Sequence, residues 1–307
     1  MALTYSQIVS TTLKNYTKLF DNIFKKYPLT EKLLAAGKVD DQDGGEKIFI
    51  PIEYAANDTV GWIAKNGTIS TDPQEIITGA EDQWRILAGT VLFNDLEGMK
   101  NRGSKAIVKL MKAKIKNLEK AMTKNLAESL HTAQTGQAMN GIPDIVSTSG
   151  DLHGIAVSDA AAWASAYAND TSEPLAIIDM ATAYNTVSDG NDTVDLIDSS
   201  QTLYEKYESL VQPQLRFTDS RTADAGFKQN LTYKSAVVVL DKDCDSDRMY
   251  FLNTDYLYIV AMSGRKFHAF PAVQASNQIN DVVKVVFYGN LMCSNRWMQG
   301  MLDGRTA

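Results

Sequence analysis

The sequence is poor in the residues that form disulfide frameworks, metal centres and catalytic dyads. Its 307 residues include two cysteines, Cys244 and Cys293, and three histidines, His131, His153 and His268. Two cysteines so far apart match neither a disulfide framework nor the spacing of a zinc site. No histidine lies four residues from another ligand, as a metalloprotease helix would require. The sequence therefore predicts no metal site, no cofactor and no catalytic residue.

Longer signatures of enzymes and membrane proteins are also absent. The chain has no G-x-x-x-x-G-K-[ST] phosphate-binding loop and no G-x-S-x-G nucleophile elbow. No segment approaches eighteen uninterrupted apolar residues, and the N-terminal segment lacks the apolar core of a signal peptide. We therefore expect a cytosolic protein that is neither an enzyme nor embedded in a membrane.

One aspartate-rich turn has the outline of a metal-binding loop. Asp241, Asp243, Asp245 and Asp247 alternate in DKDCDSD like the start of a calcium loop. The glycine of the sixth position is missing, and Leu252 stands where the closing glutamate would be. We interpret this segment as a solvated turn.

What the sequence does contain is one long helical pattern from Lys100 to Ala133, without proline. At about 1.5 Å per residue it would be roughly 50 Å long. The apolar residues of one face are Ile107, Met111, Ile115, Leu118, Met122 and Leu126. The lysines of the opposite face are Lys105, Lys109, Lys112, Lys116 and Lys120.

The positive charge of the chain is concentrated in this helix. Lys100 to Lys124 contains nine basic residues and one acid, a balance of +8, in a chain of net charge −7, so the rest sums to −15. The lysine face is either a solvated surface or a surface that meets a polyanion such as nucleic acid.

A strand pattern and a long polar loop precede the helix. Glu46–Tyr54 (EKIFIPIEY) has isoleucines alternating on one face, and Pro51 confines such a strand to an edge or a protruding ribbon. We predict that it pairs with Gln83–Phe93 as an antiparallel ribbon. The intervening loop is too long and too poor in apolar residues to fold on its own subunit, so it is expected to reach a neighbouring subunit. The residues expected to make this contact are Trp62, Ile63 and Ile69; the alternative is that they belong to the core of their own subunit.

Helix and strand patterns alternate through the remaining chain. Helices are predicted at Tyr5–Tyr27, at Thr30–Ala36 with Thr30 as its cap, at Leu175–Val187 and at Gln201–Leu210, and a turn at Asp40–Gly45. Strands are predicted at Thr193–Ser199, Ser235–Leu240, Arg248–Leu252, Tyr256–Met262, Asp281–Asn290 with Gly289 ending it, and within Leu291–Leu302.

The order of these segments resembles the major capsid proteins of tailed bacteriophages with the Hong Kong 97-like fold. The resemblance rests on GGEKIFIPIEY leading into a hairpin with Val60, Gly61 and Trp62 near its tip, then on the return strand DQWRILAGTVLF and the long helix directly after it. The segments that extend it over almost the whole chain are AMNGIPDIV, DLIDSSQTLYEKYESL, SAVVVLDKDC, MYFLNTDYLYI and NLMCSNRWMQGML.

The resemblance implies an α+β fold and a particular division of the chain. The implied parts are an N-terminal arm at 1–45, an extended loop at 46–94, a peripheral domain at 95–174 and 256–296 with a spine helix at 99–134, and an axial domain at 175–255 and 297–307. Tyr204, Tyr207 and Leu210 are candidates either for packing near the axial domain or for the core of their own subunit. Such proteins self-assemble as pentamers and hexamers into an icosahedral-type shell around double-stranded DNA. Similar shells carry the spine helix on the inner side, which would turn the lysine face toward packaged DNA for non-specific contact.

The resemblance also implies partners and a location. Some members join their subunits through an isopeptide bond between a lysine and an asparagine, and a glutamate near the C-terminal strand assists its formation. Lys65 near the hairpin tip could supply the lysine, but no glutamate occurs between Asp281 and Ala307. We therefore expect non-covalent assembly. The arm begins almost at Met1, so any scaffold is expected to be a separate protein, beside a portal and decoration proteins. The expected location is the virion, after assembly in the host cytoplasm.

Two other functions remain open at this point. An encapsulin-type compartment shares the fold but encloses enzymes. A nucleic-acid-binding module would also use the lysines, although this acidic chain lacks the interleaved aromatic residues of a single-strand binder.

Overall fold

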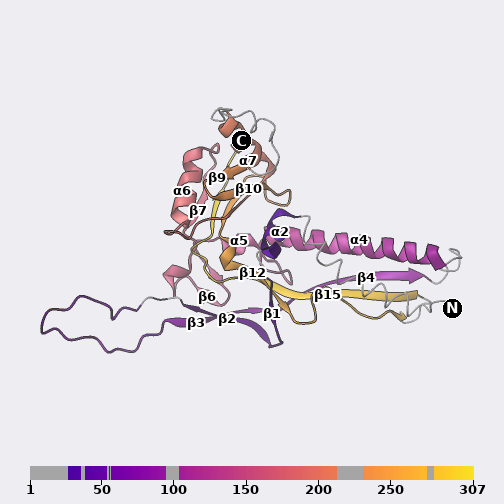
Figure 1. Ribbon diagram of the computed structural model, residues 1–307, viewed down its shortest axis with the longest axis horizontal. Coiled ribbons are helices and arrows are strands. Elements are labelled where there is room, and N and C mark those ends of the chain that lie inside the picture. Colours follow the sequence, from indigo (N-terminus) through magenta and orange to yellow (C-terminus); the bar gives the residue numbers. More distant parts are fainter. Residues whose placement is uncertain are drawn as a thin grey trace.

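The computed structural model describes residues 27–35, 39–53, 55, 57–94, 104–212, 231–274 and 280–307. These residues form two six-stranded sheets with helices packed against them, and a two-stranded hairpin that projects beyond both. The hairpin points toward one end of the long axis of the molecule, while the spine helix extends toward the other (Figure 1). No helix in this described part of the chain is long and apolar enough to cross a membrane.

The first sheet is organised around one long strand, β15 (Asn280–Cys293). Its antiparallel partners are β4 (Arg85–Asn94), β12 (Leu257–Met262), β13 (His268–Ala269) and β14 (Val273–Gln274), and β1 (Val39–Gln42) runs parallel to β12. The prediction that Gly289 ends this strand is wrong, because β15 continues through it. A Cβ atom at Gly289 would lie 2.6 Å from the carbonyl oxygen of Val260, so glycine here permits close strand packing.

The spine helix, α4 (Ser104–His131), packs along β4 of this sheet (Figure 1). Its 28 residues correspond to about 42 Å. The predicted apolar face is confirmed where side chains are described: Ile115, Met122 and Leu126 are buried, and Leu118 is partly buried. The side chains of Ile107 and Met111 lie outside the described part.

Helix and sheet approach most closely at Gly89 of β4. A Cβ atom there would lie 2.5 Å from Cδ1 of Leu118 and 3.2 Å from Sδ of Met122. The absence of a side chain at this position therefore sets how near α4 lies to the sheet.

The second sheet contains strands from widely separated parts of the chain. In order across the sheet they are β7 (Tyr167–Asp170), β16 (Gly300–Asp303), β11 (Met249–Leu252), β8 (Leu196–Ser199), β10 (Ala236–Leu240) and β9 (Leu231–Tyr233). The helices α6 (Ile177–Val187) and α7 (Gln201–Val211) pack against it. β7 lies before residue 175, so this sheet begins earlier in the chain than the axial segment that the resemblance implies.

Tyr207 of α7 is buried in the core of the second sheet, and Tyr204 packs against the same core. The structure therefore shows Tyr204 and Tyr207 packed in the core of their own subunit, which was one of the two interpretations.

The projecting hairpin consists of β2 (Lys47–Glu53) and β3 (Ile77–Gln83), paired so that Lys47 faces Gln83 and Glu53 faces Ile77. The predicted pairing of β2 with Gln83–Phe93 is wrong except at Gln83, because the run from Arg85 onward forms β4 and pairs with β15. The reason is the core: Val91 and Phe93 are buried in the first sheet, where β4 is covered by α4. The expectation for Pro51 is confirmed, because β2 belongs to a two-stranded ribbon.

The segment before the hairpin differs in detail from its prediction. The helix α2 (Pro28–Ala35) begins at Pro28, so Thr30 lies inside the helix and is not its cap. Proline suits a first helical position, where its missing N–H has no partner to lose. The predicted turn at Asp40–Gly45 contains β1 up to Gln42. The predicted helix at Tyr5–Tyr27 lies, except for its last residue, outside the described residues.

Short elements complete the chain. They are α5 (Ile142–Ile145), β5 (Asp151–Leu152), β6 (Ile155–Ala156), a 3-10 turn at Ala161–Trp163 and another at Thr254–Tyr256.

Candidate functional site: the extended hairpin and the spine helix

The loop between β2 and β3 exposes large apolar side chains. Trp62 is fully exposed, and Ile63 and Ile69 are 56% and 69% exposed. Val60, beside them at the tip, is 84% exposed. Burying an aromatic side chain removes roughly 150–250 Å² from water, worth about 4–6 kcal/mol at about 25 cal/mol per Å². Burial of these side chains against another molecule would therefore stabilise the contact by several kcal/mol.

Within the described residues of this loop, the side-chain hydrogen bonds are local. The side chain of Asn57 accepts hydrogen bonds from the backbone and hydroxyl of Thr59, at 2.9 and 2.6 Å. Ser70 donates to Asp72 at 2.8 Å. Such contacts shape turns within the loop while its apolar side chains face outward.

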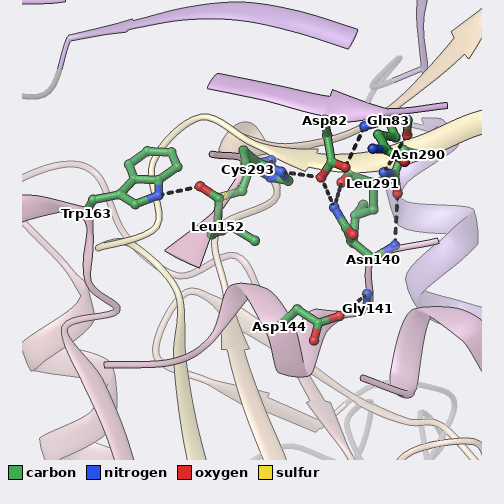
Figure 2. Close-up of polar contacts among 11 residues, drawn as sticks. Asp82, Gln83, Asn140, Gly141, Asp144, Leu152, Trp163, Asn290, Leu291 and Cys293 are labelled. Carbon is green, nitrogen blue, oxygen red and sulfur yellow. Dashed lines mark hydrogen bonds and ion pairs between the residues drawn. The ribbon is translucent and has the colours of Figure 1, made fainter. Parts of the chain in front are cut away.

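The base of the hairpin, in contrast, is held by a buried polar network around Asp82 of β3 (Figure 2). Oδ2 of Asp82 accepts from Nδ2 of Asn140 at 2.6 Å and lies 3.0 Å from Nδ1 of His153. Its Oδ1 accepts from the backbone N–H of Gln83 at 2.7 Å. Burial raises the pKa of Asp82, but the hydrogen bonds from His153, Asn140 and Gln83 outweigh it and hold the pKa below its ordinary value of 3.8.

The same network determines the tautomer of His153. Its Nε2 lies 3.1 Å from the backbone N–H of Cys293 in β15, which can only donate. Nε2 is therefore the acceptor nitrogen, and Nδ1 carries the proton that His153 donates to Asp82. The backbone oxygen of His153 also accepts from the N–H of Glu81 at 2.9 Å. One histidine thus joins the hairpin to the long strand of the first sheet.

Two asparagines complete this connection. The backbone N–H of Asn140 donates to Oδ1 of Asn290 at 2.9 Å, and Nδ2 of Asn290 donates to the carbonyl of Gln83 at 3.2 Å. The chain thereby leaves β3 at a defined position before it enters β4. No pattern in the sequence connects Asp82, Asn140, His153 and Asn290, because they share no local spacing.

The lysine face of α4 is described in part. Lys116 and Lys120 are exposed. Lys124, one turn further, forms an ion pair with Glu128 at 3.2 Å. The side chains of Lys105, Lys109 and Lys112 lie outside the described part of the chain. Lys116 and Lys120 are therefore accessible to an external anion.

The C-terminal end of α4 brings together residues that the sequence does not connect. His131, the last residue of the helix, faces Asp198 of β8 and Asp241, which directly follows β10. All three are buried. The interpretation of the aspartate-rich segment as a solvated turn is wrong at Asp241, because this residue faces the helix rather than solvent. Burial alone would lower the pKa of His131, but the hydrogen bond and charge of Asp198 raise it to about 9.

The two cysteines, Cys244 and Cys293, are buried free thiols. Burial raises the pKa of both, to about 12 at Cys293. They pack as small apolar residues.

No family model matches the sequence, and no curated protein matches it at a significant level. The structure is similar to a chain in the capsid asymmetric unit of cyanophage A-1(L), with a TM-score of 0.69 and 17% identity over 90% of this chain and 93% of that one. It is also similar to the capsid of a native GTA particle, with a TM-score of 0.60 and 9% identity over 88% and 89% of the two chains. For the capsid of Myoviridae phage XM1 the TM-score is 0.53, at 12% identity over 88% and 90%.

Likeness at such low identity shows the fold. The chain has the Hong Kong 97-like fold, and the prediction from sequence resemblance is confirmed at this level.

Proposed function

We propose that this chain of Hong Kong 97-like fold is the major capsid protein of a tailed bacteriophage, and that many copies form an icosahedral-type shell around double-stranded DNA. The observation that supports this most directly is the projecting hairpin, which exposes Trp62, Ile63 and Ile69 on a loop far from the core of its own subunit (Figure 1). Its role would be mechanical, without catalysis.

In such a shell the hairpin lies over an adjacent subunit within pentamers and hexamers. The exposed apolar tip supplies the contact energy, and the network around Asp82 sets the direction in which the hairpin leaves its subunit. Contacts of this kind are symmetric in every copy, so a modest energy per subunit is multiplied around each ring. Assembly is non-covalent in this proposal, with Lys65 as an ordinary exposed loop residue.

The lysine face of α4 lines the interior and contacts DNA without sequence preference. Lys116 and Lys120 are exposed, as phosphate contact requires. The acidic balance of the rest of the chain keeps DNA from binding elsewhere.

The other parts of the proposal follow the resemblance. The arm occupies 1–45, the extended loop 46–94, the peripheral domain 95–174 and 256–296, and the axial domain 175–255 and 297–307. The protein is located in the virion, after assembly in the host cytoplasm. A scaffold, a portal and decoration proteins are its further partners.

A loop-replacement variant tests the shell function. Glu53 and Ile77 face each other in register, so residues 54–76 can be replaced by Asn-Gly, which closes a two-residue hairpin turn. We expect the native protein to form closed particles in size-exclusion chromatography and negative-stain microscopy. The variant should give folded subunits with unchanged circular dichroism and no closed particles.

The matched control is Lys65→Gln, which alters the loop without removing its apolar residues and should leave assembly intact. Native protein that stays monomeric over a range of protein and salt concentrations would contradict the proposed function. Closed particles from the loop-replacement variant would contradict the role of the hairpin.

DNA contact is tested separately with Lys116→Gln/Lys120→Gln. The control, Lys65→Gln/Lys242→Gln, removes the same charge from exposed positions outside the helix. We expect the helix variant to form shells that retain less DNA, with a salt dependence of binding reduced by roughly 0.9 in log–log slope for each lost phosphate contact. Equal retention by both variants would show that the lysine face is a solvated surface.

A further inference from the structure

A buried cluster of three side chains lies where the end of the spine helix meets the second sheet. His131, Asp198 and Asp241 are 3%, 0% and 2% exposed. Nε2 of His131 lies 2.7 Å from Oδ2 of Asp198 and 3.9 Å from Oδ2 of Asp241. One potential ligand atom from each residue lies within 4.8 Å of the others. Imidazole and carboxylate groups are common ligands of divalent metals.

The orientation of the imidazole suits metal binding. Nδ1 of His131 lies 3.1 Å from the backbone carbonyl of Ala127, one turn earlier in α4. A carbonyl only accepts, so Nδ1 carries a proton and Nε2 faces the carboxylates. Metal-binding histidines are typically oriented in this way, with the second nitrogen donating to a carbonyl or carboxylate.

The carboxylates have oxygens that no donor satisfies. Oδ1 of Asp241 accepts from the backbone N–H of Asp243 at 3.0 Å, which leaves Oδ2 turned toward His131. That Oδ2, and Oδ1 of Asp198, are buried without a hydrogen-bond partner. A protonated imidazole has a single Nε2–H, and it is already directed at Asp198. One proton therefore cannot satisfy both carboxylates, and a buried unsatisfied carboxylate oxygen is costly.

We propose that His131, Asp198 and Asp241 bind one divalent transition-metal cation, Zn²⁺ or Mn²⁺. Two positive charges balance the two carboxylates beside a neutral imidazole. Metal–ligand distances of about 2.0–2.2 Å place ligand atoms roughly 3–3.5 Å apart. The two distances from Nε2 of His131, 2.7 and 3.9 Å, lie on either side of that range. Ca²⁺ fits less well, because it takes 6–8 oxygen ligands.

The proposed metal joins three elements that are distant in sequence. It would connect the last residue of α4 to β8 and to the segment after β10, and so fix the spine helix against the second sheet. The site is complete within one chain, so it does not depend on the proposed shell function.

Metal uptake by the full chain tests the proposal. After treatment with chelator and dialysis, we expect the native protein to bind about one equivalent of Zn²⁺ or Mn²⁺ by calorimetry and elemental analysis. At a hundredfold excess of metal over Kd, Tm should rise by about 5 °C. Asp241→Asn should weaken binding at least about tenfold and lose most of the Tm rise, because it removes one charged ligand.

Asp247→Asn is the matched control, because it removes the same charge from an exposed position of the same turn. It should bind metal like the native protein. Circular dichroism establishes that each variant is folded before metal is added. The proposal is overturned if the native protein takes up no metal, in which case the cluster is an imidazolium with two carboxylates. It is also overturned if Asp241→Asn binds as tightly as Asp247→Asn.

Discussion

Removal of the Asp82 carboxylate should release the base of the hairpin while both sheets stay folded. In the variant Asp82→Ala, Nδ1–H of His153 and the side-chain amide of Asn140 lose their common acceptor. Both residues are buried, so water cannot readily replace it. The hairpin would then be attached to the first sheet by fewer contacts, and its opening should become more frequent.

The size of the effect follows from these two hydrogen bonds. A hydrogen bond to a charged group contributes about 1.5–3 kcal/mol, so the two together contribute about 3–6 kcal/mol. The amide of Asn140 also donates to the carbonyl of Leu291 at 3.3 Å, which offsets part of its loss. We therefore expect about 3 kcal/mol, equivalent to roughly 150-fold more frequent opening.

Hydrogen exchange measured by mass spectrometry reports this opening directly. Peptides from β2 and β3 should exchange roughly 150-fold faster in Asp82→Ala, with exchange in the second sheet unchanged. The control is Glu81→Gln, which removes the neighbouring charge on the other face of β3. Glu81 pairs with Lys47, and both are about half-exposed, so its loss should change little. Equal exchange in the two variants would refute this account of the hairpin base.

The same carboxylate predicts a pH dependence. The folded pKa of Asp82 is below its ordinary value, so its contribution to stability is full above the unfolded pKa of about 3.9 and declines as the pH falls through the folded pKa. Hairpin exchange in the native protein, corrected for the intrinsic rate, should therefore accelerate below about pH 4. In Asp82→Ala this acceleration should be absent. If the acceleration persisted, a titrating group other than Asp82 would be its cause.

Three further variants test other contacts. Gly89→Val should destabilise the chain by about 1–3 kcal/mol in urea unfolding, because its side chain would collide with Leu118, whereas Gly61→Ala, with open space around it, should be neutral. Arg296→Met should lower the free energy of unfolding by about 3 kcal/mol or more in the same assay, because the buried guanidinium donates hydrogen bonds to five backbone carbonyls. These are the carbonyls of Asp144, Ile145, Ser149, Gly150 and Trp163. A decrease below about 1 kcal/mol would contradict this role. Trp62→Ser/Ile63→Ser should leave the Tm of the isolated subunit unchanged while abolishing particles in microscopy, and a lowered Tm would mean that these residues pack on their own subunit.

Local patterns in the sequence were sufficient for several of the described elements. The apolar face of α4, the helix α6 and the strands β10, β11 and β12 were predicted close to their observed bounds. Each has a periodicity that depends only on neighbouring residues, 3.6 for a helix and 2 for a strand. The order of these elements was also sufficient for the resemblance that predicted the fold.

Periodicity does not identify the partner of a strand. The runs that became β3 and β4 are both compatible with pairing to β2, and only the packing of Val91 and Phe93 beneath α4 assigns β4 to β15. Gly289 shows the same limit. The sequence pattern predicted that the strand ends at this glycine, whereas in the structure the glycine allows β15 to pass close to β12. Such outcomes depend on side chains that are far away in the chain.

By itself, the sequence determined the spine helix with its charged and apolar faces, the exposed loop before it, and the order of elements. Only the tertiary structure decided which polar residues meet. It placed Asp82 beside His153, and it placed His131 beside Asp198 and Asp241 in one buried cluster. The physical reason is that hydrogen bonding and metal binding depend on distance in space, whereas the local patterns read from a sequence reflect separation along the chain.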